Sequence, residues 1–188
     1  NPSIDRTLVL PGVLDRGGVQ RVEHTISQAG GKGVNISRAA VAAGVPTLAV
    51  LPARADDPFV EDVARAGIPC HPCRPAGSIR VNLTLTEPDG TTTKINSAGA
   101  ETGPEQVAEL ADAVVREAHG ASWVVLAGSL PPGAPSSFYA DLLPRLHGVA
   151  PVAVDTSDAP LSALVAGLDR CAPQLMKPNA EELASITG

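Results

Sequence analysis

Residues 123–133 read Trp-Val-Val-Leu-Ala-Gly-Ser-Leu-Pro-Pro-Gly, a short apolar run followed by a turn rich in Gly and Pro. An amphipathic segment with helical spacing comes next, and the same order of strand, turn and helix recurs around apolar strands expected at 152–154 and 172–176. Such alternation implies a parallel sheet with right-handed crossovers. The second half of the chain therefore predicts an α/β fold with a mostly parallel sheet.

The first half of the chain has a different pattern of expected elements. It predicts a strand over 19–26, an Ala-rich helix over 34–43 and a strand over 47–51. Residues 80–86 alternate in polarity, and Glu87-Pro88-Asp89-Gly90 turns them back into 91–96. This hairpin is polar and has one face without an obvious cover. It is expected to act as a lid over a ligand or as an edge for a homodimer, with lid strands at about 8–26 and 79–97.

Composition restricts the classes of function. The chain has 188 residues, a net charge of −6 and only four aromatic residues, which leaves no basic face or stacking platform for a nucleic acid. Its apolar runs are shorter than the roughly 20 residues of a membrane span, and its first residues do not form a secretion signal. We expect a cytoplasmic protein without nucleic-acid or membrane partners.

Three cysteines, an odd number, fit a reducing compartment. Cys70-His71-Pro72-Cys73 has the spacing of a redox or zinc half-site, but a redox pair usually opens a helix and a zinc site needs a second ligand pair, for which only Cys171 remains. The favoured interpretation is a coincidental pair in a connecting segment. Further along, Thr102 and Glu105 have capping-box spacing before a helix expected over 104–118.

Polar and Gly-rich residues follow all three expected parallel strands. In such sheets ligands bind beyond the carboxyl ends of the strands. Residues 128–133, Asp155 and the segment from Lys177 to Glu182 occupy these places. Asp155 and Glu182 offer hard carboxylate oxygens suited to Mg²⁺, although each could also be an acid at the start of a helix.

Residues 29–35, Ala-Gly-Gly-Lys-Gly-Val-Asn, precede the Ala-rich helix. The glycines allow a ligand to approach the backbone, and the helix N-terminus favours an anion, so a sugar or phosphate cradle is one interpretation and a flexible turn is the other. The spacing matches neither a Walker A motif nor the GxGxxG fingerprint, which disfavours an NAD-binding domain. Arg80 and Asn82, two apart on a strand, share one face, where the guanidinium could bind a phosphate bidentately or stay solvated.

Six segments together resemble the PfkB (ribokinase-like) carbohydrate kinases, and they run in order along the whole chain. In chain order they are Asn1-Pro2-Ser3-Ile4-Asp5, residues 30–35, Arg80-Val81-Asn82, residues 128–133, Asp155-Thr156-Ser157 and residues 177–182. The Asn-Pro opening with the Arg-x-Asn strand is most similar to the phosphosugar branch, which includes 1-phosphofructokinase. The resemblance implies a three-layer ribokinase-like core with a small β lid.

The resemblance also implies site roles. Sugar binding would fall to Asp5, Gly31, Lys32, Asn35 and Asn82, with Arg80 on the phosphate that the substrate already carries. Nucleotide and magnesium binding would fall to Lys177, Asn179 and Glu182, with Asp155 beside them. The implied reaction transfers the γ-phosphoryl group of ATP, with Mg²⁺, to a phosphosugar such as fructose 1-phosphate.

The sequence departs from the family pattern at several points. The Gly-Ala-Gly-Asp segment with the family's catalytic base is absent, so the base is expected beyond Gly188 and no catalytic residue is assigned within 1–188. The chain resembles the N-terminal portion of a kinase domain clipped at both ends, without the C-terminal ATP-binding part. A sugar-phosphate-binding fragment or regulatory pseudokinase is therefore the alternative. Smaller departures are residues 53–58, where the family has glycines, Ile79, where it has Thr, and Asp158, where it has Gly.

Overall fold

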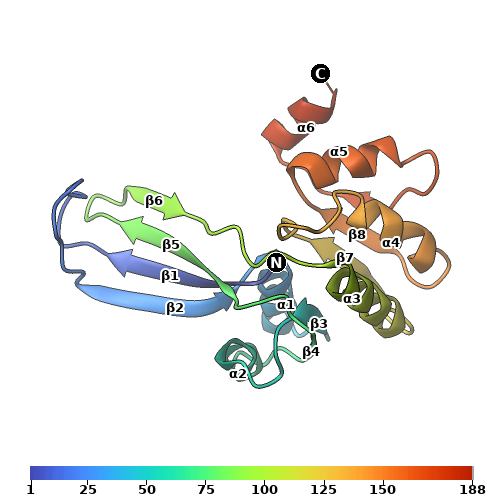
Figure 1. The fold of residues 1–188 in the computed structure, drawn as a ribbon, viewed down its shortest axis with the longest axis horizontal. Coiled ribbons are helices and arrows are strands. Elements are labelled where there is room, and N and C mark those ends of the chain that lie inside the picture. Colours follow the sequence, from blue (N-terminus) through green and yellow to red (C-terminus); the bar gives the residue numbers. More distant parts are fainter. Residues whose placement is uncertain (188) are drawn as a thin grey trace.

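The computed structural model describes residues 1–187 and contains three sheets and six helices among them, while Gly188 lies outside the described residues. A four-stranded sheet, here called the projecting sheet, extends away from a body that holds the other two sheets and the helices (Figure 1). The α/β fold class predicted from the sequence is confirmed. In chain order the elements are β1 Ser3–Val9, β2 His24–Gly30, α1 Lys32–Ala42, β3 Ala49–Pro52, α2 Pro58–Arg65, β4 Cys70–Cys73, β5 Arg80–Thr86, β6 Thr92–Ile95, α3 Pro104–Glu117, β7 Val124–Ala127, α4 Phe138–Leu146, β8 Val152–Asp155, α5 Asp158–Ala166, β9 Leu175–Met176 and α6 Ala180–Thr187.

The projecting sheet has the strand order β2-β1-β5-β6. Its central pair, β1 and β5, is parallel, while β2 and β6 flank it in antiparallel register. Ser3 pairs with both Gly30 and Arg80, so the sequence-distant segments that carry candidate site residues start from one end of this sheet. The predicted hairpin is present as β5 and β6.

The strand predicted over 19–26 is displaced, because β2 covers His24–Gly30 instead. Pairing with β1 sets this boundary: Val9 is the last residue of β1 and lies opposite His24. One more hydrogen bond, from the Glu23 N–H to the Val9 carbonyl at 2.8 Å, extends the pairing, and Pro11, which lacks a backbone N–H, then follows Leu10 where the ladder ends. Asn1 and Pro2 precede β1, and Ser3–Asp5 already belong to that strand.

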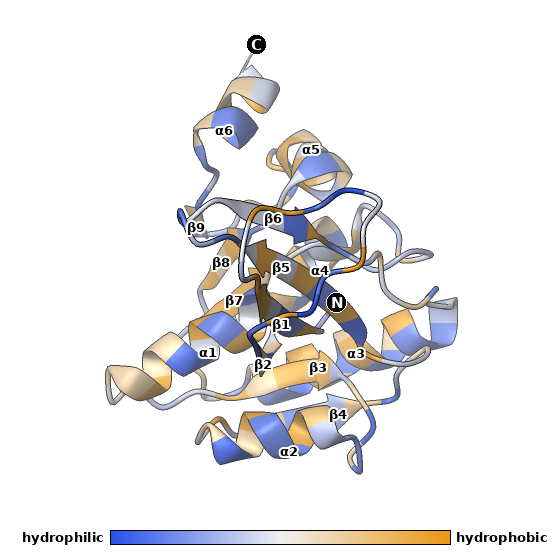
Figure 2. Ribbon diagram, turned by 90° about the vertical axis from the view of Figure 1, so that its left-hand side faces the viewer, coloured by the Kyte–Doolittle hydropathy of each residue, from blue (hydrophilic) through white to orange (hydrophobic). Residues whose placement is uncertain are grey.

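The body holds two parallel sheets. Strands β3 and β4 form one, and β7-β8-β9 form the other in that order, as the strand and helix alternation predicts. Figure 2 shows β3 and β8 as mostly hydrophobic ribbons, whereas α2 carries both hydrophobic and hydrophilic residues. Helix α2 starts after Asp57, whose carboxylate accepts a hydrogen bond from the Phe59 N–H and caps it. Each helix of this kind buries its apolar stripe against a sheet.

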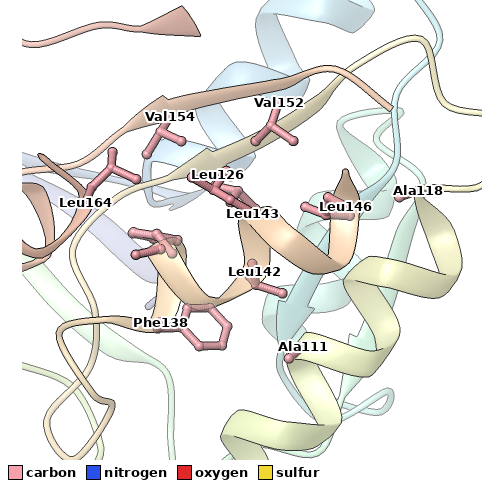
Figure 3. Packing of buried hydrophobic residues seen from close by; sticks show 12 residues of the cluster. Ala111, Ala118, Leu126, Phe138, Leu142, Leu143, Leu146, Val152, Val154 and Leu164 are labelled. Atoms are coloured by element: carbon pink, nitrogen blue, oxygen red, sulfur yellow. The ribbon is translucent and has the colours of Figure 1, made fainter. Parts of the chain in front are cut away.

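The larger core lies between β7–β8 and helices α3, α4 and α5 (Figure 3). Leu126, Val152 and Val154 come from the strands, while Leu142 and Leu146 come from α4, and all five are buried. A second cluster, including Phe59 and Val63 of α2, packs against β3. These cores hold the carboxyl ends of β7 and β8 in fixed positions, which is where the candidate site lies.

Two local predictions are wrong. Gly103, not Thr102, is the N-cap of α3, because Pro104 occupies the first helical position and places the cap on the residue before it. The Cys70-His71-Pro72-Cys73 segment is strand β4 and not a connector. Three steps of extended chain separate its cysteines by about 10 Å at Cα, beyond the roughly 7 Å limit for a disulfide, so this geometry excludes a redox pair.

None of the helices in residues 1–187 is both long enough and apolar enough to cross a membrane.

Candidate functional site

Asp5 lies at the centre of a partly buried polar cluster at the base of the projecting sheet. Its Oδ1 accepts hydrogen bonds from Ser3 Oγ at 2.8 Å and from Asn82 Nδ2 at 3.2 Å. The register places Asp5 directly opposite Asn82 on the parallel neighbour strand, which is why residues 77 positions apart meet here. The carboxylate is thus oriented by two donors before any ligand is present.

Arg80 lies one pleat away from Asn82, on the same face of β5. Its Nη1 donates to the Ser97 carbonyl at 2.9 Å, while its Nε is buried without a hydrogen-bond partner among the described residues. Asn82 Oδ1 is buried and unpartnered in the same sense. Burial lowers the pKa of Arg80, and the nearby charge of Asp5 opposes that shift. The expectation that Arg80 and Asn82 face the same side is confirmed.

A pocket opens beside Arg80. It is small, with a cavity volume of about 30 Å³, and its wall comes from Asn1, Pro2 and the segments around Pro52, 75–80, 99–102 and Pro131, but not from Asp5 or Asn82. Several prolines stiffen this wall, and the guanidinium is the cationic side chain in it. The wall thus presents a guanidinium, a group that binds small anions, at a shallow depression of the surface.

The glycine loop between β2 and α1 closes against β1. Gly31 has φ +95°, and a Cβ there would lie 3.2 Å from Pro2 Cα; a Cβ on Gly30 would lie 2.1 Å from Asp5 Oδ2. Position 31 therefore favours glycine for its dihedral angle and its approach to the Pro2 backbone, whereas a side chain at Gly30 would have to displace the Asp5 carboxylate. Gly31 joins Asp5, Arg80 and Asn82 at the base of the sheet, and Lys32 begins α1.

Lys32 points to the second half of the chain. Its Nζ lies 2.7 Å from Asp155 Oδ1, at the carboxyl end of β8, and Lys177 Nζ lies 3.5 Å from Asp155 Oδ2. Three residues assigned to two different binding regions by family resemblance thus form one ion-pair cluster. No sequence pattern indicates this pairing, because charge partners 123 positions apart depend on the tertiary fold.

The turn after β7 supports this cluster. Gly128 donates its N–H to the Asp155 carbonyl at 2.9 Å, and its own carbonyl accepts hydrogen bonds from Tyr139 Oη and Thr156 Oγ1, both at 3.0 Å. Gly128 has φ +99°, and a Cβ there would lie 3.5 Å from Lys32 Cβ, so the turn approaches the start of α1 closely. Tyr139 and Thr156 are supporting residues that the sequence analysis missed.

Three predicted site residues have local partners instead. Asn35 Oδ1 accepts a hydrogen bond from Arg38 Nη1 at 2.7 Å. Asn179 and Glu182 cap α6 reciprocally: Glu182 N–H donates to Asn179 Oδ1 and Asn179 N–H donates to Glu182 Oε2, both at 2.8 Å. These contacts give each residue a structural role, and their ligand roles stay predictions.

The fit to Mg²⁺ can be judged from the available ligands. Among residues 1–187 there is no group of three or more His, Cys, Asp or Glu side chains that could hold a metal ion. Asp155 is occupied by two lysines, and Glu182 by its own helix cap. The described residues therefore do not supply a magnesium site by themselves, and the assignment of Asp155 and Glu182 as metal ligands stays a prediction.

The catalytic base is not assigned to any described residue. The family resemblance places it beyond Gly188, and the description of the chain ends one residue earlier, at Thr187. Gly188 and the expected position of the base therefore lie outside the described residues, and the location of the base stays a prediction.

A comparison with known proteins identifies the family of this chain. Residues 1–188 match the pfkB family carbohydrate kinase domain. The chain is 36% identical to a 1-phosphofructokinase of Xanthomonas campestris pv. campestris and 31% identical to one of Escherichia coli K12, in each case over 100% of this chain and 60% of the relative. It spans about 60% of the length of these relatives.

Solved structures agree with this result. Phosphofructokinase-2 from Escherichia coli in complex with fructose-6-phosphate superposes with a TM-score of 0.88 at 26% identity, covering 98% of this chain and 61% of that one. A possible 1-phosphofructokinase from Thermotoga maritima has the same fold, with a TM-score of 0.85 at 23% identity over 96% of this chain and 58% of that one. The expected ribokinase-like architecture is confirmed. The chain belongs to the pfkB family of carbohydrate kinases.

Proposed function

We propose that this chain forms the sugar-phosphate-binding part of an ATP-dependent phosphosugar kinase, with fructose 1-phosphate as its substrate and fructose 1,6-bisphosphate as the product. Relatives named 1-phosphofructokinase support the substrate class. Transfer of the γ-phosphoryl group needs two substrates held in line and their charge neutralised, and a site built from oriented polar groups supplies both requirements.

The observation that carries the proposal is the pair of unpartnered buried atoms, Arg80 Nε and Asn82 Oδ1. Buried polar groups are almost always hydrogen-bonded, so an orphaned donor and an orphaned acceptor on one face of a strand favour a ligand with both kinds of group. A sugar phosphate has them: phosphate oxygens accept from the guanidinium, and a hydroxyl donates to the amide oxygen.

Each residue then has a defined task. Arg80 holds the phosphate already on the sugar, while Asp5 accepts a hydrogen bond from a sugar hydroxyl with its orientation fixed by Ser3 and Asn82. Gly31 lets the ligand approach the backbone where α1 begins. ATP, carried with Mg²⁺, would occupy the region near Lys177. The metal would neutralise phosphate charge there.

A thermal-shift titration tests the substrate site. We expect fructose 1-phosphate to raise the melting temperature more than fructose 6-phosphate or tagatose 6-phosphate, because a ligand that binds the folded state stabilises it by mass action. Unphosphorylated fructose and inorganic phosphate are the matched controls. A cooperative transition that no sugar phosphate moves would contradict the proposal.

The second candidate is a sugar-phosphate-binding chain without turnover. It is favoured by the contacts of the two predicted metal ligands, because lysines pair with Asp155 and the cap of α6 holds Glu182. A coupled assay for ADP on the natural full-length product separates the two, because the 188 residues alone lack the expected base under either candidate. Formation of ADP that depends on fructose 1-phosphate supports the kinase, whereas selective binding without ADP supports the second candidate.

We also propose that the projecting sheet acts as a lid and pairs two copies of the chain. Its outer face, opposite Asp5 and Asn82, carries Leu83, Leu85 and the exposed Ile95, and the four strands of β6–β5–β1–β2 extend beyond the helices of the body (Figure 1). Apolar strand surface of this kind is typical of an interface. Sedimentation equilibrium should show a dimer for the natural chain and a shift to monomer for Ile95→Lys.

A further inference from the structure

Lysine is scarce in this chain, and its distribution is uneven. The sequence has three lysines, Lys32, Lys94 and Lys177. Two of them contact one carboxylate, that of Asp155, at 2.7 and 3.5 Å. Lys94 lies on β6 in the projecting sheet, and the described residues include no ion pair to it. A single acidic side chain therefore contacts two of the three lysine ammonium groups.

The three partners differ in how firmly they are held. The Asp155 side chain is 15% exposed, and its backbone is fixed by the ladder of β8 and by the N–H of Gly128. The side chains of Lys32 and Lys177 are 43% and 71% exposed. Asp155 is thus the stationary member, while both lysines end in groups that can turn away from it on flexible stems.

The charge balance leaves the cluster cationic. Two ammonium groups against one carboxylate give a net charge of +1, and Tyr139, the other titratable group near Asp155, stays neutral because burial raises its pKa. A group with several negative charges competes for the ammonium groups more strongly than one carboxylate does, since the attraction scales with charge. Lys32 adjoins the sugar-side glycine loop and Lys177 follows β9, so the cluster lies between the two predicted binding regions.

We propose that Asp155 is a positioning residue that holds Lys32 and Lys177 together between the sugar and nucleotide regions, and that an entering polyphosphate takes both ammonium groups from it. This inference rests on the proposed phosphotransfer function. It gives Asp155 a role other than direct metal binding: the carboxylate holds the two lysine ammonium groups in place, without other anions on them, until a polyphosphate binds. Both lysines then neutralise charge on the polyphosphate.

Acylation of lysines, measured residue by residue with mass spectrometry, tests the arrangement. In Asp155→Asn we expect acylation of Lys32 and Lys177 to rise about two- to fivefold, the range for loss of a partly exposed ion pair, with Lys94 unchanged. Asp112→Asn is the matched control, because it breaks a 2.7 Å pair with Arg145 away from the cluster and should leave all three lysines unchanged.

Inorganic tripolyphosphate with EDTA then serves as the polyphosphate. In Asp155→Asn it should protect Lys32 and Lys177 with one common midpoint concentration and should not protect Lys94. In the natural chain the midpoint should be similar or higher, since Asp155 competes. If Asp155→Asn does not fold, Lys177→Met tests the same point: Lys32 should stay protected without ligand, and its tripolyphosphate midpoint should rise at least threefold.

Three results would overturn the proposal. These are unchanged acylation in Asp155→Asn, different midpoints for the two lysines, and a rise in acylation of both lysines when Mg²⁺ alone is added to the natural chain, since the metal would then be the partner of Asp155. The tests contain no sugar, so a failed sugar titration with a positive acylation result would reject the sugar proposal and retain this one.

Discussion

Asn82 donates a hydrogen bond to Asp5, its register partner on the adjacent parallel strand. The bond uses the amide nitrogen, so the amide oxygen of Asn82 is left buried without a partner among the described residues, one pleat from the unpartnered Nε of Arg80. We expect these two unpartnered atoms to bind different parts of a sugar phosphate, because only Arg80 carries a positive charge.

Arg80→Ala and Asn82→Ala should separate these parts. We expect Arg80→Ala to weaken fructose 1-phosphate binding by about 10- to 100-fold, as expected for loss of a charged hydrogen bond of about 1.5–3 kcal/mol, while binding of fructose and of ATP changes little. Asn82→Ala should weaken the sugar phosphate and fructose by similar factors. Isothermal titration calorimetry measures both. Equal losses for ATP and sugar phosphate in Arg80→Ala would contradict the assignment.

Substitution of two nearby glycines, the N-cap Gly31 and Gly33 in the first turn of α1, should change the free energy of unfolding in different ways. Gly31→Ala should destabilise the fold by at least about 1–2 kcal/mol, because φ is +95° and the added Cβ meets Pro2. Gly33→Ala should be neutral or stabilising by up to about 0.5 kcal/mol, because Gly33 lies in α1 with open space around it. Urea unfolding of the two variants gives the free energies directly. Similar losses in both would show that the loop is not held against Pro2.

Asp158 is the non-glycine residue with a positive φ, +56°, among those described. The left-handed conformation costs an ordinary L-residue about 1 kcal/mol, and the family pattern has glycine at this place. Asp158→Gly should therefore raise the free energy of unfolding by up to about 1 kcal/mol, less the loss of the hydrogen bond from Ser157 Oγ to its carboxylate. Asp158→Ala, which loses the same bond but keeps the strain, is the control and should be destabilising.

Tyr139 is the sole tyrosine, so alkaline absorbance reports its ionisation alone. Burial and then the charge of Asp155 raise its pKa in the folded chain, whereas in guanidinium it should titrate near about 10. The raised folded-state pKa means that its contribution to stability is complete below about pH 10 and is lost as the pH rises further. Titration of the folded chain below the value in guanidinium would refute the buried placement.

Sequence pattern predicted most of the body and less of the projecting sheet. Strands such as Val152–Asp155 were recoverable because they are short apolar runs between clear turns, buried by packing on both sides. The start of β2 was not, because its residues are polar and exposed and only the partner strand sets its boundary. Among site residues, the shared face of Arg80 and Asn82 follows from strand alternation, and Asp5 was implied by the family resemblance alone. The Lys32–Asp155 pair depends on how the two halves of the chain pack.

The attachment of the projecting sheet has a mechanical consequence. Ser3 is paired with both Gly30 and Arg80 at the end of the sheet next to the body, and the strands extend from there for about 23 Å, from seven residues at about 3.3 Å each. A swing of about 10° would carry its free tip by about 3–4 Å yet barely displace Arg80 at the pivot. In the proposed site, phosphate binding by Arg80 and movement of the tip would therefore be separable, because the binding residue lies at the attached end of the sheet.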